Sequence, residues 1–345
     1  MPEAVIVATG RTPIGRANKG SLVECRPDDL AALVIREVLA KVPQLDPQTV
    51  EDVIMGSGQP GGEAGYNVGR VAALLAGLPN VPGVTVNRYC SSSLQTIRMA
   101  AHAIKAGEGD VFVAAGVETV SRYLNGAADT GPHNPLFAEA EERTVARTPA
   151  AGEPWTPLTG LPDVYIAMGQ TAENVAEFKK VSREEQDEFA LQSQTRAVAA
   201  QEAGFFDREI IPVTTPSGTV VTKDDGPRPG TTLEGLSGLK PVFREGGTVT
   251  AGNACPLNDG AAAVIVMSDT RAHQLGITPL ARIVASGVSG LNPEIMGLGP
   301  VGAVQRRAVA PSGSTTGAPR SWPCPGRRPR TSTRGRWSCP CPPGR

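Results

Sequence analysis

Short apolar runs alternate with amphipathic ones along the first third of the chain, and this alternation limits the fold more than any other feature. Residues 4–9 (AVIVAT) and 52–56 (DVIMG) have the composition of buried strands, and residues 28–41 (DDLAALVIREVLAK) have helical periodicity between them. An element order of this kind is typical of layered α/β proteins. We therefore predict an α/β fold.

The same pattern recurs around Cys90. Residues 83–86 (GVTV) predict a strand, and residues 110–116 (DVFVAAG) predict the next one. Between them, apolar residues recur at spacings of three and four up to a glycine that is typical of a helix end; these are Leu94, Ile97, Ala101 and Ile104, followed by Gly107. The sequence thus places Cys90 at the N-terminus of a helix that follows a strand.

Two interpretations of Cys90 stay open at this point. A thiol reacts as the thiolate, and the positive end of a helix dipole stabilises a thiolate. The small side chains of residues 91–93 leave room for a substrate to approach. The alternative is a buried and inert cysteine at the end of a strand, and position alone does not exclude it.

A glycine motif at residues 56–61 (GSGQPG) fits the G-x-G-x-x-G spacing of dinucleotide-binding loops. Pro60 and the following loop delay the next helix, and no acidic residue that could bind a ribose lies between Glu63 and Glu108. We therefore expect no dinucleotide site here.

From about residue 122 to 244 the chain becomes rich in Pro, Gly and charged residues, which predicts an inserted and mostly exposed segment. Two helices are predicted within it. One covers residues 164–178, and the other begins with Ser182 and Glu185 in capping-box spacing and ends at Gly204. Core-like sequence then returns. A strand is predicted at residues 261–268, and another unit of the same kind at residues 280–288.

Charge and cysteine content narrow the class of protein. The 33 basic and 34 acidic residues nearly balance, the N-terminus lacks the features of a secretory signal, and six cysteines are too few for a disulfide framework in 345 residues. We expect a protein of the reducing cytoplasm.

The tail differs from the rest of the chain. Residues 304–345 contain nine Arg but neither Lys nor an acidic residue, and residues 308–345 contain no Leu, Ile, Met, Phe or Tyr. No amphipathic period runs through them, so we expect residues 304–345 to be disordered. An Arg-rich tail of this kind also leaves open a second interpretation, a protein that binds nucleic acid or a partner through this tail.

Several long motifs resemble the thiolase superfamily, specifically an acetyl-CoA C-acyltransferase (3-ketoacyl-CoA thiolase or acetyl-CoA acetyltransferase). They occur in the order VNRYCSSSLQT, GVETVSR, MGQTAENVA, SREEQDEFALQSQTRA, TVTAGNACPLNDGAAAV and GVSGLNPEIMGLGPV. The resemblance implies a five-layer fold made of two similar α/β halves, with the second half truncated or replaced here.

The resemblance also implies a division of the chain. Residues 1–121 and 247–269 are expected to form the first half, and residues 122–246 a loop domain for coenzyme A. Residues 270–303 are expected to begin the second half, whereas the tail is unrelated to the family. Members are usually dimers or tetramers, so a homodimer or homotetramer is the expectation for the family.

By resemblance, Cys90 is the nucleophile that accepts an acyl group from 3-ketoacyl-CoA or acetyl-CoA. Met168 matches a residue near the reacting end of the pantetheine arm, Arg228 a position at the nucleotide end, and Ala254 with Cys255 a wall of the pocket. Coenzyme A and its acyl thioesters are then substrates, with no permanently bound cofactor, no metal and no membrane. Fatty-acid metabolism, including β-oxidation, is the expected setting.

Part of the family's catalytic set is missing. Segments of the type N-E-A-F, G-H-P and C-x-G-G-G, which carry the catalytic histidine and second cysteine, do not occur. His102 lies about 18 Å along its helix from Cys90, because each helical residue rises about 1.5 Å. We expect little or no turnover and hypothesise that an out-of-frame or replaced segment begins near Val304. A ketoacyl synthase-like enzyme is a further alternative.

Overall fold

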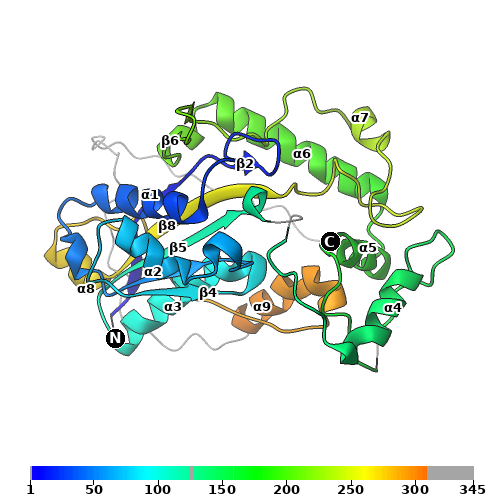
Figure 1. Cartoon of the computed structure of the whole chain (residues 1–345), viewed down its shortest axis with the longest axis horizontal. Helices are drawn as coiled ribbons and strands as arrows, with labels where there is room; N and C mark the ends of the chain where they lie inside the picture. The colour runs from blue at the N-terminus through cyan, green and yellow to red at the C-terminus, as the bar shows by residue number, and fades with distance from the viewer. Residues whose placement is uncertain (1, 124–126, 158, 309–345) are drawn as a thin grey trace, which may run out of the picture. The chain divides into compact units, whose positions relative to one another are not determined.

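The computed structural model describes residues 2–123, 127–157 and 159–308 (Figure 1). At its centre, the described residues form a seven-stranded mixed sheet in the order β4-β3-β5-β8-β1-β9, with β2 paired to β8. Strand β3 is parallel to both β4 and β5, whereas β8 is antiparallel to β5 and β1. The strands are β1 (Ala4–Arg11), β2 (Gly15–Arg16), β3 (Asp52–Gly56), β4 (Gly83–Val86), β5 (Val111–Thr119), β8 (Asn258–Ser268) and β9 (Ala281–Arg282).

Helices cover the two faces of this sheet unequally. The described helices are α1 (Pro27–Ala40), α2 (Val68–Leu75), α3 (Ser92–Ala106), α4 (Ala138–Ala146), α5 (Met168–Lys179), α6 (Arg183–Glu202), α7 (Leu233–Ser237), α8 (Asp269–Gln274) and α9 (Gly299–Ala308). Residues of α1, α2 and α8 share one hydrophobic core with the sheet, and α3 packs on the opposite face. The predicted α/β fold is confirmed.

Alternation along the strands builds both cores. Val53 and Met55 of β3 belong to the core of α1 and α2, whereas Ile54 belongs to the core of α3. Successive strand residues point to opposite faces of a sheet, so a strand covered on both sides is apolar throughout. This explains why β3 occupies the predicted residues 52–56. Strand β4, at the edge of the sheet, occupies the predicted residues 83–86.

The prediction for the helix after Cys90 was correct in extent but not in every buried position. Gly107 ends α3 in the left-handed conformation, with φ of 81°. Ala101 and Ile104 are buried as expected, but Leu94 is 67% exposed. The first turn buries Ser92 instead, which lies on the opposite side of a helix from Leu94 because two residues turn through about 200°.

The predicted inserted segment, residues 122–246, contains α4 to α7 and a short hairpin of β6 (Val213–Thr214) and β7 (Val220–Val221). The predicted capping box at α6 is confirmed, because the side chains of Ser182 and Glu185 each accept a hydrogen bond from the other residue's backbone N–H. The prediction that a helix begins at residue 164 was wrong. Helix α5 begins at Met168, since the preceding backbone is used in tertiary contacts.

Glu294 makes those contacts. Its fully buried carboxylate accepts hydrogen bonds from the Asp163 backbone at 2.8 Å and from Trp155 Nε1 at 2.7 Å, and lies 3.1 Å from Arg147 Nη1. It thereby attaches the 3₁₀ turn Pro293–Leu298 to the inserted segment.

The predicted unit at residues 280–288 is reduced to the two-residue strand β9. Helix α9 continues through the predicted boundary at residue 304 up to Ala308. The rest of the tail, including Cys324, Cys339 and Cys341, lies outside the described residues.

Candidate functional site

Cys90 lies where the parallel part of the sheet ends. Strand β4 leads into a 3₁₀ turn, Tyr89–Ser91, and α3 follows directly. The side chain of Cys90 is exposed, as is that of Cys255, whereas Cys25 is buried. The interpretation of Cys90 as a buried thiol is therefore wrong.

Two paired glycines bring α3 onto the sheet at this point. Gly56 of β3 and Gly116 of β5 are register partners. A Cβ atom at Gly56 would lie 2.6 Å from the backbone nitrogen of Ser93, and one at Gly116 would lie 1.9 Å from the Ser93 hydroxyl oxygen. Only glycine leaves space for the first turn of α3 here. No role was predicted for this pair, although Gly56 begins the glycine motif at residues 56–61.

That motif does not form a phosphate loop. The next helix, α2, begins only at Val68, so no helix N-terminus follows the glycines directly. The expectation that Pro60 and the loop after it delay the helix is confirmed.

The residue before Cys90 has an unusual backbone conformation. Tyr89 has φ of 44°, in the left-handed region that non-glycine residues enter at a cost of about 1–3 kcal/mol. Its N–H donates to Asn87 Oδ1 at 2.8 Å, and its carbonyl oxygen accepts from the Ser92 hydroxyl at 2.6 Å. These bonds hold the turn that presents Cys90 to solvent.

Helix α3 supplies favourable electrostatics for chemistry at this turn. Its N-cap residue, Ser91, makes no side-chain capping bond. The first N–H groups of a helix and the positive end of its dipole stabilise negative charge nearby. Burial, and then the Asp129 carboxylate, raises the pKa of Tyr89 above its ordinary value, so the phenol stays neutral beside the cysteine.

The other four predicted residues lie in the inserted segment and in the loop before β8. Met168 is the first residue of α5 and is 53% exposed. Arg228 is exposed in the loop after β7, where its N–H donates to Gln194 Oε1 at 2.9 Å. Ala254 is half-buried, and its neighbour Cys255 is exposed. All five predicted side chains are thus accessible to solvent, as substrate contacts must be.

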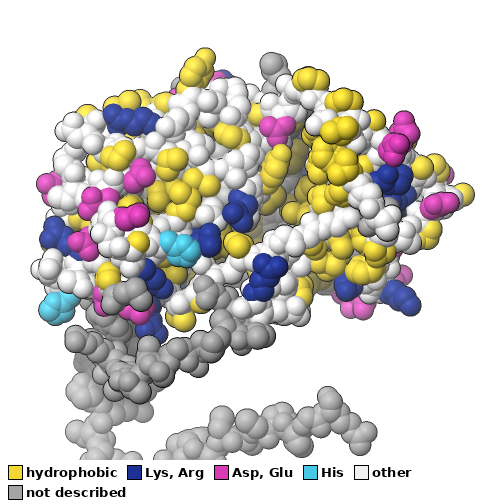
Figure 2. All heavy atoms as spheres, turned by 90° about the horizontal axis from the view of Figure 1, so that it is seen from below, with side chains coloured by type: hydrophobic (Ala, Val, Ile, Leu, Met, Phe, Trp, Pro, Cys, Tyr) yellow, Lys and Arg dark blue, Asp and Glu magenta, His cyan; other side chains and the backbone are white. Residues whose placement is uncertain are grey.

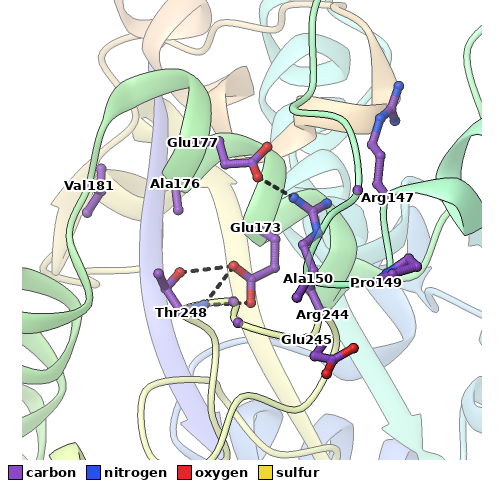
Figure 3. A pocket seen from close by; sticks show the side chains of 13 residues that line it. Arg147, Pro149, Ala150, Glu173, Ala176, Glu177, Val181, Arg244, Glu245 and Thr248 are labelled. Carbon is purple, nitrogen blue, oxygen red and sulfur yellow. Dashed lines mark hydrogen bonds and ion pairs between the residues drawn. The ribbon is translucent and has the colours of Figure 1, made fainter.

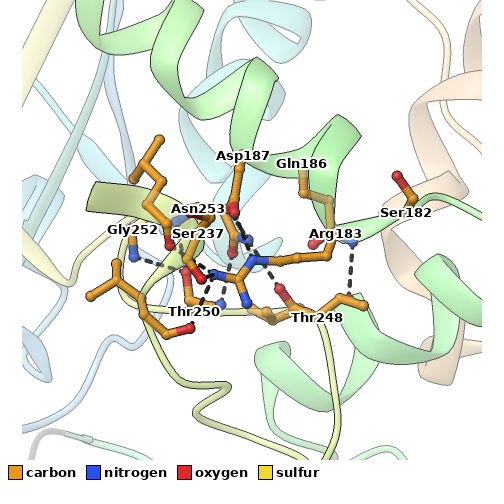
Figure 4. A network of polar contacts seen from close by, with 12 residues as sticks. Ser182, Arg183, Gln186, Asp187, Ser237, Thr248, Thr250, Gly252 and Asn253 are labelled. Atoms are coloured by element: carbon orange, nitrogen blue, oxygen red, sulfur yellow. Dashed lines mark hydrogen bonds and ion pairs between the residues drawn. The ribbon is translucent and has the colours of Figure 1, made fainter. Parts of the chain in front are cut away.

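A polar network fixes the loop that carries Ala254 and Cys255 (Figure 4). The Asn253 amide donates to Asp187 Oδ1 of α6 and to the Thr248 carbonyl, both at 3.0 Å. Asp187 is itself paired with Arg183 at 2.7 Å. The position of Cys255 is therefore set by side chains far away in the sequence.

A hollow of about 190 Å³ lies between α5 and the segment 244–248 (Figure 3). Glu173 accepts hydrogen bonds from the N–H and hydroxyl of Thr248, and Arg244 is paired with Glu177 at 2.8 Å. None of the five predicted residues lines this hollow. Arg147, which also lines the hollow, is paired with the buried Glu294. These contacts join parts of the protein, and we do not take the hollow as the candidate site.

All three histidines lie in the described part of the chain. His133 stacks on Tyr165 with 3.8 Å between ring centroids, and His102 and His273 are exposed on α3 and α8. Within the described residues, no cluster of three or more His, Cys, Asp or Glu side chains could hold a metal ion. No helix in this part of the chain is long and apolar enough to cross a membrane.

Comparisons with known proteins agree with this architecture. Residues 4–270 match the family model described as Thiolase, N-terminal domain. The chain is 46% identical over 313 residues to a 3-oxoadipyl-CoA/3-oxo-5,6-dehydrosuberyl-CoA thiolase of Escherichia coli (strain K12), covering 89% of this chain and 76% of that protein. A 3-ketoacyl-CoA thiolase of Bacillus subtilis (strain 168) is 41% identical over 319 residues, with the same two coverages of 89% and 76%.

A solved structure gives the same result. The crystal structure of the Bacillus anthracis acetyl-CoA acetyltransferase matches with a TM-score of 0.72 at 38% identity, covering 89% of this chain and 75% of that one. The chain spans about three quarters of the length of these relatives. From the family model, the relatives and the fold together, we conclude that this chain belongs to the thiolase family.

Proposed function

We propose that this chain is a thiolase-type acyltransferase whose Cys90 accepts an acyl group from an acyl-CoA. The exposed thiol at the start of α3 carries the proposal. The Cys90 thiolate attacks the thioester carbonyl carbon, and the electron pair moves to the oxygen, near the helix N-terminus. When the carbonyl re-forms, the bond to the coenzyme A sulfur breaks, and that sulfur takes up the proton that Cys90 lost.

The inserted segment, residues 122–246, is the proposed holder of coenzyme A. In this proposal Met168 contacts the pantetheine arm, Ala254 and Cys255 line its wall, and Arg228 meets the nucleotide end. The assignment is supported by the exposure of Met168, Arg228 and Cys255 and by the partial exposure of Ala254. A guanidinium also suits phosphate oxygens, because it donates several hydrogen bonds in one plane.

Turnover is expected to be slow. Among the described residues, Cys25 is buried, and His102 lies about three turns along α3 from the turn that holds Cys90. Neither is placed to exchange protons with a substrate at Cys90. Loss of cooperating catalytic groups lowers turnover by many powers of ten.

The substrate class is proposed to be 3-ketoacyl-CoA, or acetyl-CoA in the condensing direction, with fatty-acid metabolism in the cytoplasm as the setting. Several relatives are named for 3-oxoadipyl-CoA or β-ketoadipyl-CoA. Comparing the rates at which Cys90 is acylated by straight-chain and by dicarboxylic 3-ketoacyl-CoA esters therefore distinguishes the two substrate types.

An oligomer is also proposed. Strand β4 is the edge of the sheet, and its four residues are half-exposed. An edge strand with β-branched residues offers unpaired backbone groups to a second copy. Light scattering of the purified protein measures this directly, and a monomer at micromolar concentration would exclude it.

Acylation is tested by incubating the protein with acetyl-CoA and mapping the modified peptides by mass spectrometry. We expect acetylation of Cys90 in the wild type and in Cys255→Ser, and none in Cys90→Ser. A label on Cys255 alone, or no label, would overturn the proposal. A parallel thiolysis assay is expected to show little turnover, and rates near those of a full-length thiolase would contradict that part.

A further inference from the structure

Glu118 binds two groups beneath the turn that carries Cys90. It lies near the carboxyl end of β5, and its Oε2 accepts a hydrogen bond from the Gly58 N–H at 2.7 Å. Its Oε1 accepts from the hydroxyl of Tyr123. Burial, and then the bond to Glu118, raises the pKa of Tyr123 above its ordinary value, which keeps the phenol a hydrogen-bond donor.

Gly58 transmits this arrangement to the residue before Cys90. A Cβ atom at Gly58 would lie 2.9 Å from Glu118 Oε2 and 3.5 Å from both Cα and the carbonyl carbon of Tyr89. The carboxylate and the Tyr89–Cys90 peptide are therefore packed against the same glycine. Since Tyr89 has a left-handed φ, the turn needs support from its surroundings.

We propose that Glu118 is a positioning residue for Cys90, holding the 57–59 loop under the Tyr89–Cys90 peptide through Gly58. The chemical use of that position rests on the proposed acyl transfer. The positioning itself is measurable without coenzyme A, because a thiol's rate of alkylation depends on its surroundings.

Three cysteines make the test internally controlled. The alkylation rate of Cys90 measures the effect on the site, and Cys255 is the control because it is a second exposed thiol. The buried Cys25 becomes reactive only when the α/β core opens. Alkylation rates of these cysteines with iodoacetamide are measured in the full chain by peptide mass spectrometry. The proteins compared are the wild type, Glu118→Ala, Glu118→Gln and Tyr123→Phe.

We expect Glu118→Ala to slow alkylation of Cys90 by about tenfold relative to Cys255, because the turn that presents the thiol loses its support at Gly58. Glu118→Gln keeps an oxygen that can accept the Gly58 N–H bond, so it should restore most of the rate. Tyr123→Phe should give a smaller loss, and Cys25 should stay unreactive in every variant.

An unchanged Cys90 rate in Glu118→Ala, with Cys25 still protected, would overturn the proposal. If Cys25 becomes reactive in Glu118→Ala, that variant has lost its fold, and the test then rests on Glu118→Gln and Tyr123→Phe. Equal alkylation rates of Cys90 in these two variants and the wild type would then overturn the proposal. Acetyl-CoA labelling is scored separately. If the variants show the expected alkylation rates but the wild type is not acetylated, the proposed function is contradicted and the positioning role of Glu118 is supported.

Discussion

The two faces of the central sheet differ in what covers them. On one face, α1, α2 and α8 enclose a core of large aliphatic side chains, among them Leu30 and Ile35, which are almost fully buried. On the other face, α3 is the packed helix among the described residues, and its contacts with the sheet are mostly through Ala100, Ala101 and Ile104. Large side chains fill the core on the first face, whereas on the second face small side chains let the helix pack close to the sheet.

The thinly covered face is the one that presents Cys90. Small residues and the Gly56–Gly116 pair let α3 lie close to the sheet, which places its N-terminus beside the strand ends. On α3 itself the large apolar side chain of Leu94 is mostly exposed. Figure 2 shows apolar side chains spread over the surface of the molecule seen from below. The site therefore lies on the side of the sheet that has the smaller buried core.

The largest expected difference comes from the same substitution on the two faces. Leu30→Ala removes a side chain that is 2% exposed and should lower the free energy of unfolding by about 2–5 kcal/mol. Leu94→Ala should change it by less than about 0.5 kcal/mol, because Leu94 is mostly in solvent. Urea titration of both variants measures this. Equal losses would mean that something closes the α3 face in solution.

A smaller loss of stability, with a local effect on Cys90, is expected from Gly56→Ala. The new methyl group would meet backbone atoms of Ser92 and Ser93, which no side-chain rotation relieves. Overpacking of this kind costs about 1–3 kcal/mol, and it should also slow alkylation of Cys90. Gly131→Ala is the matched control, since a Cβ atom there meets nothing within 4 Å. If both variants behave alike, the close approach of α3 is not what holds the site.

The smallest effect concerns Asp52, which alternation places on the same face as Ile54. Burial raises the pKa of Asp52, and its Oδ1 has no hydrogen-bond partner among the described residues. The ionised form is thus disfavoured in the folded state, so it costs stability above the folded pKa, and this cost disappears as the pH falls below the unfolded value of about 3.9.

Asp52→Asn should accordingly raise the free energy of unfolding at neutral pH and lose this advantage at about pH 4 and below. Urea titrations across this range measure both parts. An advantage that persists unchanged in acid would show that the charge of Asp52 is not its cause.

Sequence reasoning succeeded where the determining information is local. The capping box at Ser182 and Glu185 involves neighbours three residues apart, and strands β3 and β4 are runs of apolar residues with clear ends. It failed for the start of α5, because the backbone before Met168 is held by Glu294, more than a hundred residues away. It also misjudged Leu94, since the burial of a helix face depends on what the neighbouring elements supply.

The sequence alone determined the α/β class, the place of Cys90 between a strand and a helix, and, through its motifs, the family. These follow from periodicity and composition, which each segment carries in itself. Only the tertiary structure decided that Cys90 is exposed, that Gly56 and Gly116 pair beneath α3, and that Glu118 reaches Gly58 across 60 residues of chain. Such contacts join segments that are distant in sequence, and their geometry exists only after the sheet has formed.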